Sequence, residues 1–410
     1  MLLLANEVRD YAWGRVDGLA DLLGLAPSGG PEAELWVGTH PGAPSIVVDG
    51  DPAAVGRSLA DLVAEEPVRW LGRDLAAKGF DALPFLLKVL AVGAPLSLQA
   101  HPDAEQAEAG FAREEAAGVP LDDPQRTYRD RGAKPEALVA LSDTWALCGF
   151  RRPEDAVALI DSLGLEGLSP LTELLSGPDG LHRGFEWLLR LDPDRSGELA
   201  RAVEAVVAPD PEADLDPADP SGPETARAWV ARVSAAFPGD ALAVAPLLLQ
   251  VVHLRRGDSV HLPAGNLHAY LAGAGVEVMA ASDNVLRGGL TPKHVDVDEL
   301  LAVLKFEPGV PPAPTVVVSG PGLSCYDAAE SAFGLVRVAP TETADGVVQI
   351  TPFGPSLLLA TDGEVDIAGA AAGVTLADGL AAFVGPGDGA LEVSGAGTLW
   401  WATTGDALPR

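Results

Sequence analysis

The hydrophobic pattern changes twice along the 410-residue chain, and this limits its possible folds more than any other feature. Residues 1–150 and 246–410 contain short apolar runs separated by turns rich in Gly and Pro, which is typical of strands. Residues 151–245 instead show the three-to-four spacing of amphipathic helices. The order predicts a mainly β protein with a helical insertion, in which two antiparallel sandwiches or barrels flank an α-helical domain.

Smaller segments refine this plan. Residues 57–80 have helical spacing interrupted at Pro67, so we expect a short helical stretch inside the N-terminal β domain. Residues 208–223 are acidic and rich in proline, which predicts an exposed loop within the helical insertion. We expect residues 246–310 to complete the first β domain and residues 311–410 to form a C-terminal β domain.

The composition excludes several classes of partner. A formal net charge of −32 argues against nucleic acid and against an anionic membrane surface. An anionic substrate would therefore need a locally positive pocket. Two cysteines are too few for a disulfide framework or a zinc site built from cysteines, and we expect a cytoplasmic protein. No signal peptide is expected at the N-terminus, and the longest apolar stretch, residues 241–257, is too short and too interrupted to span a bilayer.

Two segments contain histidines in positions that suit a metal site. In "PLSLQAHPD", residues 95–103, Gln99 and His101 would lie on one face of a strand, because side chains alternate with period two. In "LPAGNLHAY", residues 262–270, a Pro-Ala-Gly turn between two strands places His268 at the start of the return strand, where its position would be fixed. For each segment the alternative is a structural side chain that is hydrogen-bonded in the core.

A carboxylate in a third segment completes a possible ligand set. Glu136 lies in "KPEAL". With Gln99, His101 and His268 it would supply two imidazoles, one carboxylate and one amide oxygen, a set that suits zinc, manganese or iron. With one anionic ligand, a divalent ion would leave the site at about +1, which favours an anionic substrate.

Six segments of the chain, in the same order, resemble type I mannose-6-phosphate isomerases, which are zinc enzymes of the cupin superfamily. The Gln-x-His-Pro, Lys-Pro-Glu and Ser-Asp-Asn-Val-x-Arg motifs are the most specific part of the match. The resemblance implies two cupin-type jelly-roll β-barrels plus an α-helical domain. The segments are "YAWG" (11–14), "AELWVGTHPGAPS" (33–45), "LPFLLKVLAVGAPLSLQAHPD" (83–103), "KPEALVAL" (134–141), "LPAGNLHAYL" (262–271) and "VEVMAASDNVLRGGLTPKHVDV" (276–297).

The resemblance also implies the roles of individual residues. One Zn2+ per subunit would be held by Gln99, His101, Glu136 and His268. The catalytic positions would be Arg287, Lys134 and Glu277. Substrate contacts are implied for Ser97, Lys88, Lys293, Tyr270 and Asp283. The implied partner is a hexose 6-phosphate, and we expect a monomer.

The implied reaction interconverts mannose 6-phosphate and fructose 6-phosphate through an enediol. Zinc would act as a Lewis acid on a sugar oxygen, and the Arg287 guanidinium would stabilise the developing enediolate. Two residues are candidates for the general base: Glu277 if burial raises its pKa, and Lys134 if nearby cations depress its pKa. The sequence leaves this choice open.

Two other functions are compatible with parts of this pattern. One is another metal-dependent cupin enzyme, such as an iron oxygenase or a different sugar-phosphate isomerase. The other is a catalytically silent cupin that binds sugar or serves a structural role. Cupin oxygenases usually bind metal through several histidines, so Gln99 counts against the first alternative. The presence of Arg287 and Lys134 together with all four ligands counts against the second.

Overall fold

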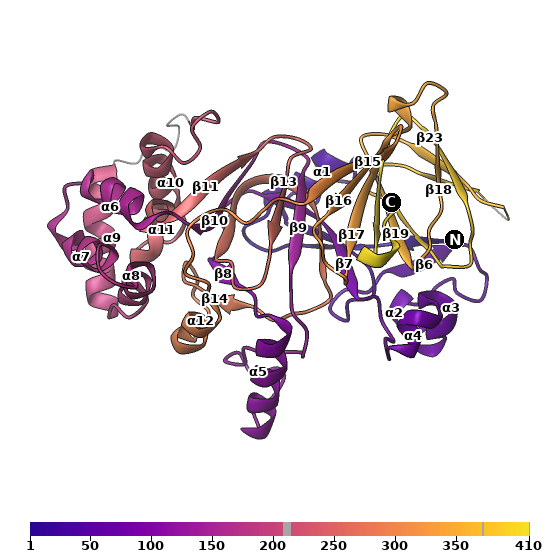
Figure 1. Cartoon of the computed structure of the whole chain (residues 1–410). Coiled ribbons are helices and arrows are strands. Elements are labelled where there is room, and N and C mark those ends of the chain that lie inside the picture. Colours follow the sequence, from indigo (N-terminus) through magenta and orange to yellow (C-terminus); the bar gives the residue numbers. More distant parts are fainter. Residues whose placement is uncertain (208–214, 371–372, 410) are drawn as a thin grey trace.

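Strands from distant parts of the sequence form two large antiparallel sheets, and the helices of residues 151–248 gather at one end of the molecule (Figure 1). The computed structural model describes residues 1–207, 215–370 and 373–409. The predicted fold class, mainly β with a helical insertion, is confirmed. No helix within these described ranges is long and apolar enough to cross a membrane.

The first sheet has ten strands and lies at the centre of Figure 1. Its main path runs β11-β10-β13-β7-β5-β2, and β9, β12, β8 and β14 pair off this path. The strands are β2 (Glu7–Arg9), β5 (Glu34–Val37), β7 (Phe85–Val92), β8 (Gln99–Ala100), β9 (Glu136–Ala140), β10 (Thr144–Phe150), β11 (Leu249–Leu254), β12 (Ser259–Leu262), β13 (His268–Ala280) and β14 (Leu286–Arg287).

Strand β13 organises this sheet because it changes partners halfway along. Its first residues pair with β10, and its residues from Gly273 onward pair with β7 and β9. Gly273 has φ +115°, and a Cβ there would lie 2.6 Å from the Asp143 carbonyl oxygen. Only glycine tolerates both conditions, so this residue permits the close approach of β13 to Asp143 at the point where the partners change.

The second sheet has eight strands in the order β15-β16-β17-β24-β19-β22-β1-β6, and it combines both ends of the chain. β1 (Leu2–Ala5) pairs with β22 and with β6 (Ile46–Asp49). The predicted domain ranges remain a prediction, and these pairings show that N-terminal strands belong to the C-terminal sheet. The others are β15 (Thr315–Gly320), β16 (Leu323–Asp327), β17 (Gly334–Val338), β19 (Ser356–Thr361), β22 (Ala381–Val384) and β24 (Thr398–Thr403).

Two small sheets complete the β structure. β18 (Val347–Ile350), β23 (Leu391–Gly395), β20 (Val365–Ala368) and β21 (Gly373–Leu376) form the first, and β3 (Arg15–Val16) and β4 (Pro31–Glu32) form the second. The described C-terminal strands therefore supply both a large and a small sheet. Their apolar side chains share a core that includes Val336, Leu358 and Trp401.

The helices between β10 and β11 pack on the central sheet through an apolar core that includes Phe150, Phe185 and Trp229. The predicted loop 208–223 lies partly outside the described residues; its remainder, 215–222, leads into α10 without regular structure. The insertion helices are α6 (Pro153–Asp161), α7 (Ser169–Leu175), α8 (Gly180–Leu189), α9 (Pro193–Val207), α10 (Pro223–Ala236) and α11 (Ala245–Leu248).

Other helices border the two sheets. The predicted helical stretch 57–80 forms three short helices, and the interruption at Pro67 is the first residue of the second one. The helices are α1 (Gly18–Leu23), α2 (Leu59–Glu65), α3 (Pro67–Leu71), α4 (Arg73–Ala77), α5 (Ala104–Ala116) and α12 (Val297–Val303). Short 3-10 helices span Glu166–Leu168, Ala241–Val244, Pro340–Glu342 and Gly405–Ala407.

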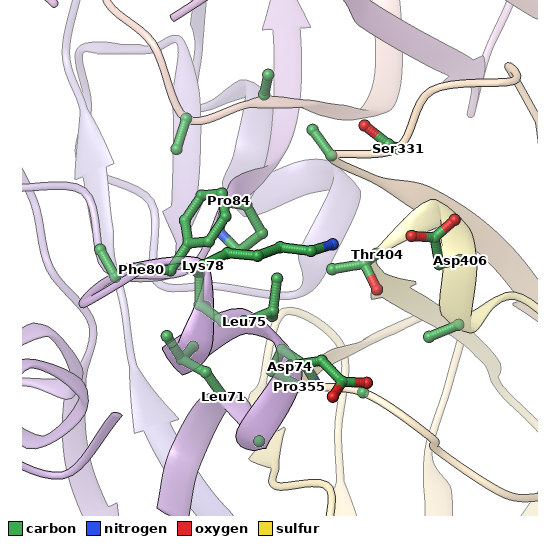
Figure 2. A pocket seen from close by; sticks show the side chains of 18 of the residues that line it. Leu71, Asp74, Leu75, Lys78, Phe80, Pro84, Ser331, Pro355, Thr404 and Asp406 are labelled. Atoms are coloured by element: carbon green, nitrogen blue, oxygen red, sulfur yellow. The ribbon is translucent and has the colours of Figure 1, made fainter. Parts of the chain in front are cut away.

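A cleft of about 760 Å³ lies between α3–α4 and loops of the C-terminal β region. Figure 2 shows the Lys78 side chain extending across this cleft toward Thr404, with Leu75, Phe80 and Pro84 nearby. None of the described residues that line the cleft belongs to the site expected from the sequence. The expected residues line a smaller cavity in the central sheet.

Candidate active site

The central sheet places charged side chains on one face through its strand register. Lys88 on β7 is opposite both Trp36 on β5 and Glu277 on β13. Directly opposed residues point to the same face of a sheet, so these three side chains form a row. Glu136 on β9 is opposite Met279, two residues from Glu277, and therefore shares that face.

Three predicted metal ligands converge at the edge of this row. The ligand atoms of His101, Glu136 and His268 all lie within 4.8 Å of one another, and all three residues are buried. The Glu136 carboxylate lies between the two imidazoles, with Oε1 3.4 Å from His101 Nε2 and Oε2 3.5 Å from His268 Nε2. His101 follows β8 directly, and His268 begins β13.

The two imidazoles are held in the form that binds metals. Each Nδ1 lies within hydrogen-bond distance of a backbone carbonyl oxygen, Asn284 at 2.9 Å for His101 and Asn266 at 3.0 Å for His268. A carbonyl can only accept, so Nδ1 carries the proton and Nε2 presents a lone pair. Burial, with the nearby Lys134 ammonium, lowers the pKa of His101 to about 4 and keeps that ring neutral.

The donor set fits a metal ion. Within the described residues, neither histidine Nε2 has a hydrogen-bond partner, although both atoms are buried. Buried polar atoms are seldom left unpaired, and two of them aimed at one carboxylate are what a bound cation would satisfy. Gln99 on β8 pairs with both His268 and Arg287 in the sheet, and it lines the cavity beside Glu136.

Lys134 contacts the central carboxylate of this group. Its Nζ lies 2.6 Å from Glu136 Oε1, and both side chains are buried. Burial opposes the negative charge of Glu136, but the Lys134 ammonium and the two imidazoles outweigh it and hold the pKa of Glu136 well below its usual range. The carboxylate is therefore ionised and available as an anionic ligand.

A second buried group of charges lines the same cavity. Lys88 Nζ is 3.8 Å from both Glu34 Oε1 and Glu277 Oε2. Burial disfavours the ammonium, but the two carboxylates outweigh it and raise the pKa of Lys88 to about 12. Burial and the Glu136 charge raise the pKa of Glu277 to about 7, even though Lys88 opposes this. The Tyr270 hydroxyl donates to Glu277 Oε1 at 3.0 Å.

Hydrogen bonds of Asn284 connect the turn that precedes Arg287 to the segment that leads into β9. Its side chain is fully buried; Oδ1 accepts from the Arg129 backbone N–H at 2.8 Å, and Nδ2 donates to the Gly132 carbonyl at 2.8 Å. Its own carbonyl is the acceptor for His101 Nδ1. One amide side chain thus fixes the backbone that orients a predicted metal ligand.

Cations gather at the outer part of the cavity. Arg287 lies on β14, and Lys293 lies in the loop that follows it. Burial and the charge of Arg129 lower the pKa of Arg287; burial, Arg287 and Arg129 lower the pKa of Lys293. Since the chain as a whole has a net charge of −32, this is a local reversal of sign.

The cavity has a volume of about 550 Å³ and brings together most of the residues expected from the sequence. His101 and His268 lie beside Glu136, where they are almost fully buried. The expected residues that line the cavity are Lys88, Ser97, Gln99, Lys134, Glu136, Tyr270, Glu277, Arg287 and Lys293.

Asp283 does not line this cavity. Its carboxylate lies 3.1 Å from His40 Nε2, and its backbone N–H donates to Asp130 at 2.8 Å. Its expected contact with substrate therefore stays a prediction.

Several lining residues were not expected from the sequence. Tyr11 and Trp13 come from the "YAWG" segment, and Phe237 follows α10. Glu34 also lines the cavity, and it is a charged residue within the apolar strand "ELWV". A charged residue beside a run of apolar residues is visible in the sequence, so Glu34 could have been found from it.

Comparisons with known proteins agree with one another. Residues 1–153 match the family described as "Phosphomannose isomerase type I, catalytic domain". The mannose-6-phosphate isomerases of Salmonella typhimurium and Escherichia coli are each 36% identical over 97% of this chain and 98% of their own length. A crystal structure of zinc-bound mannose 6-phosphate isomerase superposes with a TM-score of 0.86 at 32% identity, and covers 98% of this chain and 99% of that one.

Proposed function

Since this chain belongs to the type I mannose-6-phosphate isomerase family, as its sequence motifs indicate, we propose that it interconverts mannose 6-phosphate and fructose 6-phosphate through an enediol. The observation that carries the proposal is the buried His101, Glu136 and His268 group at a cavity that also contains Arg287 and Lys293. An ion site beside a positive cavity suits a phosphorylated sugar and fits an otherwise acidic protein.

The metal in this proposal is zinc, one ion per chain. Gln99, His101, Glu136 and His268 would hold it, because they supply two imidazoles, an ionised carboxylate and an amide oxygen. Bound zinc would supply Lewis-acid polarisation of a sugar oxygen. The zinc-bound relative supports this choice among the metals that suit such a set.

We assign the transfer of the proton between C1 and C2 to Glu277. A base works best when its pKa lies near the working pH, and that of Glu277 is about 7. Tyr270 donates to Oε1, so Oε2 is the atom that would take the proton from one carbon and return it to the other. Lys134 is the weaker candidate, because its ammonium is engaged with Glu136 at 2.6 Å.

The remaining side chains bind and orient the substrate. Arg287 would face the developing enediolate with a fixed positive charge. Lys293 and Ser97, with Arg287, would donate to the 6-phosphate, since ammonium, hydroxyl and guanidinium groups all bind phosphate oxygens. Lys88 and Tyr270 lie deeper, beside Glu277, and would contact the sugar.

A coupled isomerase assay before and after metal removal tests the proposal. We expect turnover of mannose 6-phosphate by the zinc-loaded protein, loss of turnover after chelation, and recovery when zinc is added back. Full activity after rigorous metal removal would contradict the role of the metal. A zinc-loaded protein that turns over no hexose 6-phosphate would instead favour a silent sugar-binding cupin.

A further inference from the structure

Glu34 is a buried carboxylate of the cavity that the proposed mechanism does not use. It lies on β5 and is 8% exposed. The Trp36 indole Nε1 donates to Glu34 Oε2 at 2.5 Å, which leaves Oε1 facing the Lys88 ammonium at 3.8 Å. A buried charge is costly unless it has partners, so this side chain is held in place by specific contacts.

The Lys88 ammonium lies midway between two carboxylates. Its Nζ is 3.8 Å from Glu34 on one side and 3.8 Å from Glu277 on the other, and both separations exceed the 2.7–3.2 Å of a formed hydrogen bond. The Trp36 ring supports the ammonium from a third direction, with its centroid 4.9 Å from Nζ. Neither carboxylate therefore holds the ammonium in a closed pair.

Several charged or titratable groups surround Glu277. They come from its own strand, from the two strands paired with it and from β5 beyond β7. They are Tyr270 on β13, Lys88 on β7, Glu34 on β5, Glu136 at the start of β9 and Lys134 just before β9. The charge of Glu34 acts on Glu277 directly, and Glu34 also shares the Lys88 ammonium with Glu277, since both carboxylates lie 3.8 Å from Lys88 Nζ.

We propose that Glu34 is a positioning residue for this site: it draws the Lys88 ammonium away from Glu277 and so leaves Oε2 of Glu277 free to accept a proton from the substrate. The proposal rests on the function proposed above. Without the charge of Glu34, Glu277 would be the one carboxylate left within ion-pair distance of Lys88 among the described residues, and the ammonium would close on it. Attraction at such distances is strong inside a protein, where the dielectric constant is low.

Glu34→Gln tests the proposal, because it removes the charge and keeps the shape. We expect the acid limb of the pH profile of kcat/KM to move to lower pH by about 0.5–1 unit, because a closer ammonium makes Glu277 easier to ionise. The weaker base should lower kcat about tenfold, with less than a twofold change in KM. A pH limb that does not move would overturn the proposal.

Glu32→Gln is the matched control. Glu32 is also buried, at 4% exposed, and lies two residues earlier, but it accepts from the backbone N–H groups of Ala20 at 2.7 Å and Ser28 at 2.9 Å. This variant should lose stability and keep the wild-type pH limb. If it moved the limb as far as Glu34→Gln does, the effect would be general to buried carboxylates of this segment and the proposal would fail.

A crystal structure of Glu34→Gln decides the positioning without any turnover. We expect Lys88 Nζ to move to within about 3.2 Å of Glu277 Oε2. An unchanged separation would overturn the proposal, whereas a wild-type protein without isomerase activity would overturn the proposed function instead. If Glu34→Gln does not fold, Trp36→Phe is the substitute variant, because it removes the Trp36 donor and lets Glu34 close on Lys88. The acid limb of the pH profile should then move to higher pH. A move to lower pH would contradict the proposal.

Discussion

Replacing Asn284 by alanine should weaken zinc binding, although Asn284 is not itself a proposed ligand. Its side chain makes hydrogen bonds of 2.8 Å with the Arg129 N–H, 2.8 Å with the Gly132 carbonyl and 2.9 Å with the Asp130 carbonyl. Its backbone carbonyl, the acceptor for His101 Nδ1, stays in the variant. What changes is the anchoring of the turn that holds this carbonyl in place.

The magnitude follows from these contacts. Each of the three hydrogen bonds contributes about 1 kcal/mol, and the buried groups left without a partner add to the loss, so we expect the free energy of unfolding to fall by about 3–5 kcal/mol. Loss of the support behind a metal-bound histidine typically costs about 10–100-fold in metal affinity. We expect a loss of zinc affinity in that range for Asn284→Ala.

Asn266→Ala is the matched control for this experiment. The Asn266 carbonyl accepts from His268 Nδ1 at 3.0 Å in the same way, but its side-chain amide contacts only the sulfur of Cys148, at 3.3 Å, among the bonds described. A hydrogen bond to sulfur is weak, so Asn266→Ala should lower the free energy of unfolding and the zinc affinity much less than Asn284→Ala does.

Two measurements check the prediction. Chemical unfolding in excess chelator gives the stability of the metal-free protein, and competition with a chromophoric chelator gives the zinc affinity. Equal zinc affinities for Asn284→Ala and the wild type would refute the reasoning, as would equal losses in the two asparagine variants. If Asn284→Ala does not fold, Asn284→Asp keeps Oδ1 and removes the donors to Gly132 and Asp130.

Three further predictions follow from the site. Arg287→Ala should lower kcat by about 100-fold or more while the zinc content stays intact, as measured by turnover and metal analysis; unchanged turnover would remove Arg287 from catalysis. Burial raises the pKa of Glu277 to about 7, so its ionisation should cost the metal-free protein stability as the pH rises from about 4.5 through 7. In denaturant unfolding, the free energy of unfolding of Glu277→Gln relative to that of the wild type should therefore rise by about 2–3 kcal/mol between pH 5 and pH 8. A difference that does not change with pH would count against the raised pKa. Burial raises the pKa of Cys148 to about 12, so this thiol should react with a disulfide reagent at pH 8 only after unfolding, as followed by absorbance; rapid reaction of the native protein at Cys148 would contradict this.

The sequence predicted the parts of the site that depend on short spacings. Alternation placed Gln99 and His101 together, and the structure has β8 at Gln99–Ala100 with His101 directly after it. The Pro-Ala-Gly turn placed His268 at the start of a return strand, where β13 begins. These features were predictable because a few neighbouring residues determine them.

Features that depend on strand register were not predictable in this way. Glu34 and Lys88 face each other because β5 pairs with β7 so that Trp36 is opposite Lys88. A shift of one residue would turn Glu34 to the other face, and local spacing does not determine the register of strands that are far apart in the sequence. The pairing of β1 with β22, which joins Leu2 to Phe383, has the same long-range origin.

The cations of the site are of two kinds, those paired with buried carboxylates and those without an ion pair among the described residues. Of the five lysines in the chain, Lys88 and Lys134 lie against buried carboxylates, so most of their charge is already balanced. Within the described residues, Arg287 and Lys293 form no ion pair. An incoming phosphate would therefore be attracted mainly by these two outer cations, while the paired lysines adjust the carboxylates near the reacting carbons. Reversing the charge of Lys293 should then raise KM far more than it lowers kcat. Glu34→Gln should instead lower kcat far more than it changes KM.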